Sequence, residues 1–192
     1  CVVQYNEGYE TRSPGVDGGV FDIDWATTDN VVQYNYGHDA QAYCVSVFGA
    51  EGHTTINAVV RGNLCVDNGT IEPQYGAIYL MTWAGGAIDG VRIHDNTIVH
   101  RTGTSWPVLK ESTTTYTGSR ERFFRNNLVI TDSDWMAVMA QGSMVLDHNL
   151  WWTTASNAWF NIGSSWLDGV KALPRAGLGL SLIHISEPTR RI

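Results

Sequence analysis

Apolar and polar residues alternate along this chain in short segments that recur from one end to the other. Each segment carries two or three apolar residues together with polar ones and closes on an asparagine, as in Val31–Asn35. Similar segments close at Asn6, Asn63, Asn96, Asn127 and Asn149. These asparagines, with Asn35, follow one another at intervals of 29, 28, 33, 31 and 22 residues. Such recurrence predicts a solenoid, in which each unit buries its apolar face against the next.

The pattern inside each repeat favours strands over helices. β-branched and aromatic residues alternate with polar ones at a period of two, as in Phe21–Asp24 and Val91–Asn96. No apolar spacing of three and four residues accompanies them, and the leucines form no regular lattice. Asparagine suits the recurring corner because it tolerates left-handed backbone and its amide can bond neighbouring main chain. We predict an all-β parallel β-helix of about six coils, with the asparagines stacked in a column.

Two further stretches support this fold: DGGVFDID at Asp17–Asp24 and QYNYGHD at Gln33–Asp39. Together with the asparagine-ended repeats, they resemble the right-handed parallel β-helix proteins of the pectate lyase-like superfamily. The resemblance covers roughly Val2 to Gly179 and identifies the architecture better than the substrate. It implies a secreted, carbohydrate-active protein whose partner is a polysaccharide or oligosaccharide. The chain begins directly in a repeat, so we expect a β-helix truncated at both ends.

The chain divides into three parts. Residues 1–163 are expected to form the β-helix coils, and residues 164–179 a short helix and closing segment. A serine cap would begin this helix, which would end before Pro174 or Gly177. Residues 180–192, LSLIHISEPTRRI, resemble the translated read-through of a common sequencing adapter. We expect this tail not to be native and exclude it from the fold.

One strand of each coil is expected to stack into a single exposed parallel sheet. The predicted strands are Val20–Asp24, Cys44–Phe48, Ala77–Met81, Trp106–Lys110 and Trp135–Met139. Alternation places Phe21 and Ile23 inside and Asp22 and Asp24 outside. The opposite orientation would bury two neighbouring carboxylates without partners, at a cost of several kcal/mol each.

The net charge and the cysteine content limit the kinds of partner and site that we expect. The net charge of −7 and the absence of a basic stripe argue against nucleic acid. An acidic protein favours neutral glycans or a calcium-assisted site. No apolar run approaches the ~20 residues that a membrane span requires, and we expect a monomer. Cys1, Cys44 and Cys65 are odd in number and lack metal-ligand spacing, which favours buried thiols over a disulfide framework.

Asp22 and Asp24 are the leading catalytic candidates. Two positions apart on one strand, their Cα atoms lie about 6.6 Å from each other. Carboxyl groups about 6.5–9.5 Å apart suit inverting glycosidases, in which one acid protonates the leaving oxygen and the other activates water. The pair could equally be solvated or bond the adjacent coil, or bind calcium together with Asp17 or Asp39. No cofactor other than this possible Ca²⁺ is implied.

His38 completes the predicted catalytic group if its loop folds over the exposed sheet, where it could serve as a base or orient an aspartate. A solely structural role in the turn is the alternative. His53 is a weaker candidate, and structural roles are expected for the histidines in repeat positions, which are His94, His100 and His148.

Outward-facing residues and aromatic rings are expected to bind the sugar, either as stacking platforms or through polar groups. These candidates are Trp25, Ser46, Phe48, Tyr79, Trp83, Trp106 and Lys110. Long loops at Asn68–Tyr75 and Arg101–Arg120 either line the site or are solvated spacers. A polysaccharide lyase stands second to a hydrolase, because Lys110 lies three coils from Asp24, about 14 Å at ~4.8 Å per coil. A non-catalytic glycan-binding or adhesion module is the third hypothesis.

Overall fold

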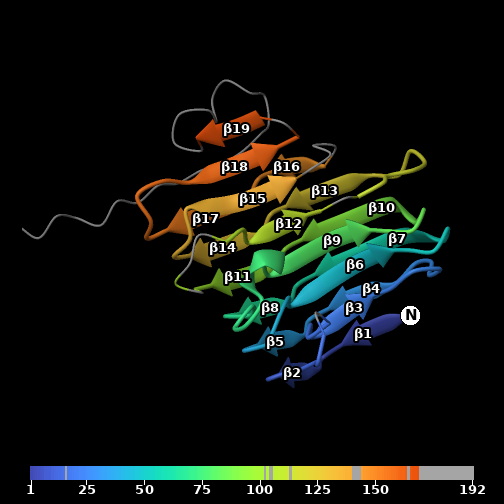
Figure 1. The fold of residues 1–192 in the computed structure, drawn as a ribbon, viewed down its shortest axis with the longest axis horizontal. Helices are drawn as coiled ribbons and strands as arrows, with labels where there is room; N and C mark the ends of the chain where they lie inside the picture. Colours follow the sequence, from blue (N-terminus) through green and yellow to red (C-terminus); the bar gives the residue numbers. More distant parts are fainter. Residues whose placement is uncertain are drawn as a thin grey trace, which may run out of the picture.

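The computed structural model describes residues 1–15, 17–101, 103, 106–112, 114–139, 144–163 and 165–168, and it is a parallel β-solenoid (Figure 1). The chain winds through three sheets in turn, so that each coil contributes one strand to each sheet. The first coil is β1–β2–β3 and the last is β16–β17–β18, with about 5 turns between the two ends. The predicted all-β parallel β-helix is confirmed.

Parallel pairing joins each strand to its counterpart in the next coil. Sheet A contains β1 (Val2–Gln4), β4 (Val31–Gln33), β7 (Thr54–Arg61), β10 (Ala87–His94), β13 (Arg122–Arg125) and β16 (Val145–Asp147). Sheet B contains β2 (Glu7–Tyr9), β5 (Tyr36–His38), β8 (Leu64–Val66), β11 (Thr97–His100), β14 (Leu128–Thr131) and β17 (Leu150–Thr153). Sheet C contains β3 (Phe21–Ile23), β6 (Val45–Gly49), β9 (Ile78–Thr82), β12 (Leu109–Glu111), β15 (Trp135–Met139), β18 (Trp159–Ile162) and β19 (Ser165–Asp168).

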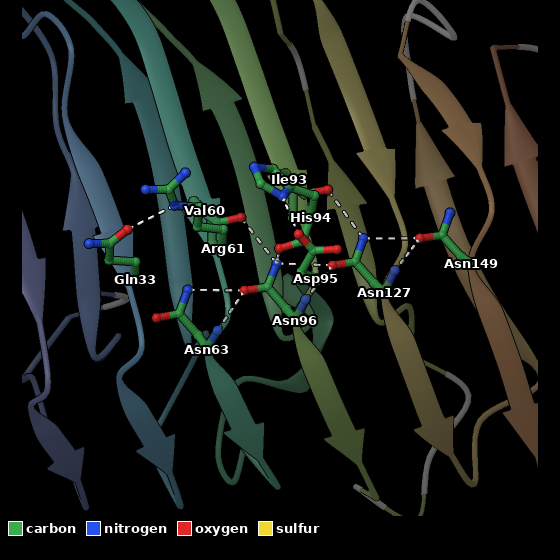
Figure 2. A network of polar contacts seen from close by, with 10 residues as sticks. All are labelled: Gln33, Val60, Arg61, Asn63, Ile93, His94, Asp95, Asn96, Asn127 and Asn149. Carbon is green, nitrogen blue, oxygen red and sulfur yellow. Dashed lines mark hydrogen bonds and ion pairs between the residues drawn. The ribbon is translucent and has the colours of Figure 1, made fainter.

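The asparagines stack in a column at the corner between sheets A and B, as predicted. Figure 2 shows the part of this column from Asn63 to Asn149. In each step the side-chain oxygen of one asparagine accepts from the amide and the backbone N–H of the asparagine one coil earlier. Asn63, for example, donates to Asn96 Oδ1 through both groups at 3.0 Å. The column therefore satisfies backbone groups that the turn leaves out of the sheets.

The expectation that these asparagines adopt the left-handed conformation is wrong. Positive φ belongs to the residue just before each of them, namely Tyr5, Tyr34, Gly62, Asp95, Asn126 and His148. The left-handed residue turns the chain, and the following asparagine points its amide into the corner, where five of the six side chains are buried. Because this amide is buried, every repeat has asparagine at the corner, whereas the type of the residue with positive φ just before it varies.

Apolar side chains from all three sheets fill the interior of the coils, with Ile23, Val47, Leu80 and Phe124 among the fully or almost fully buried residues. This interior also contains a disulfide between Cys44 and Cys65, whose Cα atoms lie 5.8 Å apart. Burial of both sulfurs agrees with the expectation, but the expected free thiols are wrong for this pair. Cys1 is exposed and unpaired.

The pairing could not be anticipated from spacing, because it depends on the packing of two sheets. Cys44 stands just before a strand of sheet C, whereas Cys65 lies one coil later in a strand of sheet B. Both side chains point into the solenoid, where the two sheets come together around its interior.

The structure differs from the expectation after residue 163. Where a serine-capped helix was predicted, Ser165–Asp168 forms strand β19, which pairs antiparallel with β18. An antiparallel strand satisfies the backbone groups at the open edge of sheet C, and this tertiary demand outweighs local helix signals. Residues 169–192, including the rest of the expected helix and the adapter-like tail, lie outside the described residues. Among the described residues, no helix has the length and apolar character needed to cross a membrane.

Candidate functional site

The outer face of sheet C carries the predicted site. Register places Asp22 beside Ser46, Ser46 beside Tyr79, and Tyr79 beside Lys110, so these residues form one row across the coils. Their neighbours Ile23, Val47 and Leu80 point into the core, which confirms the predicted orientation of β3, β6 and β9. The outward row and the inward neighbours follow directly from the alternation of side chains along each strand.

A hollow of about 580 Å³ opens on this face over the first three coils. Its lining combines carboxylates with aromatic rings and one thioether: Asp17, Asp22, Asp24, Trp25, Tyr43, Phe48, Tyr75, Tyr79, Met81 and Trp83. Concave sites with apolar walls and a few convergent polar groups are typical of ligand-binding sites. Of the sequence candidates, the structure brings together Asp17, Asp22, Asp24, Trp25, Phe48, Tyr79 and Trp83.

Asp22 lines the hollow from β3 in the first coil, and it lies between Asp17 and Asp24 in the chain. Its Oδ1 accepts a hydrogen bond from Ser46 Oγ on the neighbouring strand, which holds the carboxylate in place. The residue keeps exposed surface, yet its carboxyl is crowded by surrounding side chains, and this partial burial raises its pKa. The Ser46 hydrogen bond opposes the rise, and the nearby Asp17 and Asp24 carboxylates add to it. Asp22 therefore holds its proton to a higher pH than an ordinary aspartate.

Asp24 and Asp17 flank Asp22 in the chain. Asp24 follows β3 and accepts from the Trp25 backbone N–H at 2.9 Å, which fixes its side chain at the start of the turn. At the other end, Asp17 Oδ1 accepts from the Tyr43 hydroxyl at 2.8 Å. Burial, together with Asp22 and Asp17, raises the pKa of Tyr43 far above its usual value, so this phenol remains a donor.

Several of the aromatic rings meet edge to face, whereas Tyr79 is tilted against Tyr43 by 32° and against Tyr75 by 47°. Trp25 and Trp83 have centroids 5.3 Å apart with planes at 88°, and Phe48 meets Trp83 at 5.7 Å and 77°. Phe48 also meets Tyr79 at 85° and Tyr43 at 89°. The walls of the hollow therefore surround its contents from several directions, and they do not form one flat platform.

Not every outward residue is accessible. Ser46 is fully buried, so it cannot make the direct contact with substrate that its outward position predicted. Its role is to orient Asp22. Phe48 and Tyr79 retain only 7% and 4% exposure and contribute walls, whereas Trp83, at 36%, stands at the rim.

His38 lies elsewhere. It belongs to β5 of sheet B, where its ring stacks on Tyr36 at 4.3 Å and on Tyr9 at 5.1 Å. Its Nδ1 bonds Asp39 at 2.7 Å and its Nε2 lies 3.3 Å from Glu7. The Asp39 hydrogen bond in particular raises the His38 pKa. His38 does not line the hollow on sheet C, so the expected grouping with Asp22 and Asp24 is not found.

Two further sugar-binding candidates also lie outside the lining of the hollow. Trp106 precedes β12 and contacts Trp135, with ring centroids 6.5 Å apart. Lys110 continues the outward row beyond Tyr79, and burial lowers its pKa. Lys110 is three rungs from Asp22, which shares its coil with Asp24, and this agrees with the three coils predicted between Lys110 and Asp24.

Only one of the two additional calcium candidates lies near Asp22 and Asp24. Asp17 lines the hollow with them and bonds Tyr43, whereas Asp39 bonds His38 on the other sheet. Within the part of the chain that the structure describes, no group of three or more His, Cys, Asp and Glu side chains is arranged to hold a metal ion.

Sequence reasoning missed Tyr43 and Tyr75. Simple alternation from Ser46 would point Tyr43 inward, but the backbone N–H groups of Cys44 and Val45 both donate to the Ala77 carbonyl, at 2.9 and 3.2 Å. This irregularity puts two successive residues in the core and turns Tyr43 outward. Tyr75 reaches the hollow from the single-turn 3₁₀ helix η1 (Pro73–Tyr75), within one of the loops that the sequence marked as long.

Fold and site together define a parallel β-solenoid that carries an acidic, aromatic hollow on one outer sheet. Comparison with protein-family models, curated proteins and solved structures gives no match to this chain. The functional argument therefore depends on the geometry of the hollow.

Proposed function

We propose that the hollow on sheet C binds a polysaccharide and that Asp22 and Asp24 hydrolyse one of its glycosidic bonds. The observation that carries this proposal is the placement of two same-face carboxylates inside an aromatic hollow of about 580 Å³. Aromatic rings offer apolar surface to the C–H faces of a sugar, while carboxylates accept from its hydroxyl groups. A site of this composition fits an uncharged or cationic glycan better than an anionic one.

The raised pKa of Asp22 suits acid–base catalysis. It makes Asp22 the candidate for the general acid, which leaves Asp24 as the candidate for the base. Asp22 donates its proton to the glycosidic oxygen as the bond to the anomeric carbon breaks. Asp24 removes a proton from the water that attacks this carbon from the opposite face, and exchange with solvent restores both groups. Residues two apart on an extended strand have Cα atoms about 6.6 Å apart, which leaves room for the carboxyl separation of about 6.5–9.5 Å that inverting enzymes use.

An oxidising location is consistent with this activity. The Cys44–Cys65 disulfide lies in the core, and disulfides persist mainly in secreted and extracellular proteins. Secretion would bring the hollow to extracellular polysaccharides.

The test uses Asp22→Asn and Asp24→Asn on a panel of soluble polysaccharides, with reducing ends and glycan affinity measured in parallel. Each variant should lose roughly 10²–10⁴-fold in kcat while it keeps its affinity within a fewfold. Asp95→Asn is the matched control, because Asp95 is an exposed corner residue with positive φ, a conformation that asparagine tolerates. Full activity in both hollow variants would refute the assignment.

The same assay separates the two alternatives. Lys110 favours a lyase, because a lysine with a lowered pKa can remove a proton beside a uronate carboxyl. A calcium-assisted lyase would release unsaturated sugars that absorb in the ultraviolet and would stop when a chelator is added. A binding module would retain affinity for a glycan without any release of reducing ends from the wild-type chain.

A further inference from the structure

The charged side chains that line the hollow are all acidic. The hollow contains three carboxylates, from Asp17, Asp22 and Asp24, and no lysine or arginine among the described residues that line it. Low-dielectric walls strengthen the field of charges within a concave site. An anionic sugar would enter against this field, whereas a cation would enter with it.

The ring geometry indicates the same kind of ligand by an independent route. Stacking of a flat sugar ring needs an open aromatic face, but the rings of the hollow meet at 88° for Trp25 and Trp83 and at 85° for Phe48 and Tyr79. An ammonium ion that enters the hollow meets aromatic rings as well as carboxylates. Aromatic rings attract organic ammonium ions more strongly than neutral groups of the same size.

We propose that the substrate is a glycan whose sugars carry free, protonated amino groups, and that Asp17 is the residue that selects them. This inference rests on the proposed function for the identity of the polymer and goes beyond it in the charge of the sugar. Asp22 and Asp24 are committed to proton transfer, which leaves Asp17 as the carboxylate available for a permanent ion pair. Its Oδ1 is fixed by the Tyr43 hydroxyl at 2.8 Å, and its residue remains exposed.

The order of the three carboxylates along the chain predicts how Asp17 would act on the substrate. Asp17 lies at the Tyr43 end of the hollow and Asp24 at the Trp25 end, with Asp22 between them. An amino group held at Asp17 would fix the register of the sugar chain relative to the reacting bond. Asp17 is therefore a specificity-determining residue in this scheme, and it does not take part in bond breaking.

The experiment compares three hexasaccharides of matched length: glucosamine hexamer, its fully N-acetylated form and oligogalacturonate. Titration calorimetry near pH 6, where most of the amines are protonated, should show the amine form binding about tenfold or more tightly than the acetylated form, because hydrogen bonds between charged groups exceed neutral ones. Oligogalacturonate should bind most weakly. Added salt should reduce the preference for the amine.

Asp17→Asn should remove that preference, raising KM for the amine hexamer about tenfold with kcat nearly unchanged. Asp95→Asn, at the corner between sheets A and B and outside the hollow lining, should leave both values as in the wild type. Equal or tighter binding of the acetylated or uronate hexamer would overturn the inference, as would a full preference in Asp17→Asn.

The two proposals can fail separately. Hydrolysis of neutral glycans that depends on Asp22 and Asp24, without preference for amines, would refute only the substrate assignment. Salt-sensitive binding of the amine hexamer without any bond cleavage would support the ligand class and refute the hydrolase.

Discussion

Replacement of one asparagine in the middle of the column should destabilise the whole solenoid. In Asn96→Ala the change removes an amide that is buried, with 2% of its surface exposed. Asn96 Oδ1 accepts two hydrogen bonds from Asn63, and its Nδ2 donates to Asn127 Oδ1 at 2.9 Å and to the carbonyls of Val60 and His94 at 3.1 and 3.0 Å (Figure 2).

The magnitude follows from these partners. A hydrogen bond contributes about 1 kcal/mol net, and a buried group left without its partner costs about 1–3 kcal/mol. In Asn96→Ala both donors of Asn63 and the Val60 carbonyl lose a partner in a corner without room for bulk water. The expected loss is therefore about 4 kcal/mol, which is large for a single substitution.

Asn6→Ala is the matched control within the same column. Asn6 is exposed at the first coil and donates to Gln4 O at 2.9 Å and to Asn35 Oδ1 at 3.0 Å. Water can replace its amide, so the expected cost is about 1 kcal/mol or less.

Urea unfolding followed by circular dichroism provides the measurement. With a slope of about 2 kcal/mol/M, Asn96→Ala should lower the midpoint by about 2 M and Asn6→Ala by less than about 0.5 M. Equal shifts in the two variants would contradict the claim that burial gives the column its strength. Loss of less than about 1 kcal/mol in Asn96→Ala would refute the accounting of partners.

Three further predictions concern pH and the disulfide. The pKa of Asp22 is raised in the folded state, so the contribution of this group to stability is present at low pH and is lost as pH rises through that pKa. Asp22→Asn should therefore raise the thermal midpoint at pH 7 but not at pH 3. An unchanged midpoint at pH 7 would contradict the burial of the Asp22 carboxyl. Burial lowers the pKa of His100 to about 4, so the folded protein should lose about 3 kcal/mol of stability as pH falls from about 6.5 to about 4. His100→Leu should remove this loss, which urea titrations across the same pH range would measure. Replacing Cys44 and Cys65 together by alanine should cost about 3 kcal/mol, because their bond closes a loop between residues 21 apart; an unchanged urea midpoint would exclude the bond.

The sequence determined the fold and the facing of sheet C to a large extent. Recurrence of the asparagine-ended segment predicted the stacked coils, and strict alternation placed Asp22 outside and Ile23 inside. Both features are local and periodic, so they are visible without knowledge of tertiary contacts. The hydrophobic demand of the interior then fixes the strand orientation, since a slip of one residue would reverse every side chain.

Features that depend on non-local geometry were not predictable in this way. Alternation tells which face of a strand a residue occupies, but not which of three sheets the strand joins, and His38 was therefore grouped with the wrong sheet. The irregularity at Cys44 breaks the period of two and exposes Tyr43. Strand β19 depends on an open sheet edge that local helix signals do not register.

The position of the hollow follows from the sizes of three neighbouring residues in the outward row. Asp22 and Ser46 have short side chains, and the large ring of Tyr79 follows in the third coil, so the row is lowest in the first two of the three coils that the hollow spans. Tyr43 and Tyr75 close the hollow where the strands begin, and Trp25 and Trp83 close it where the strands end. Core residues point the other way and set the stacking of the coils. Outward residues can therefore change the chemistry of the hollow without altering the solenoid that supports it.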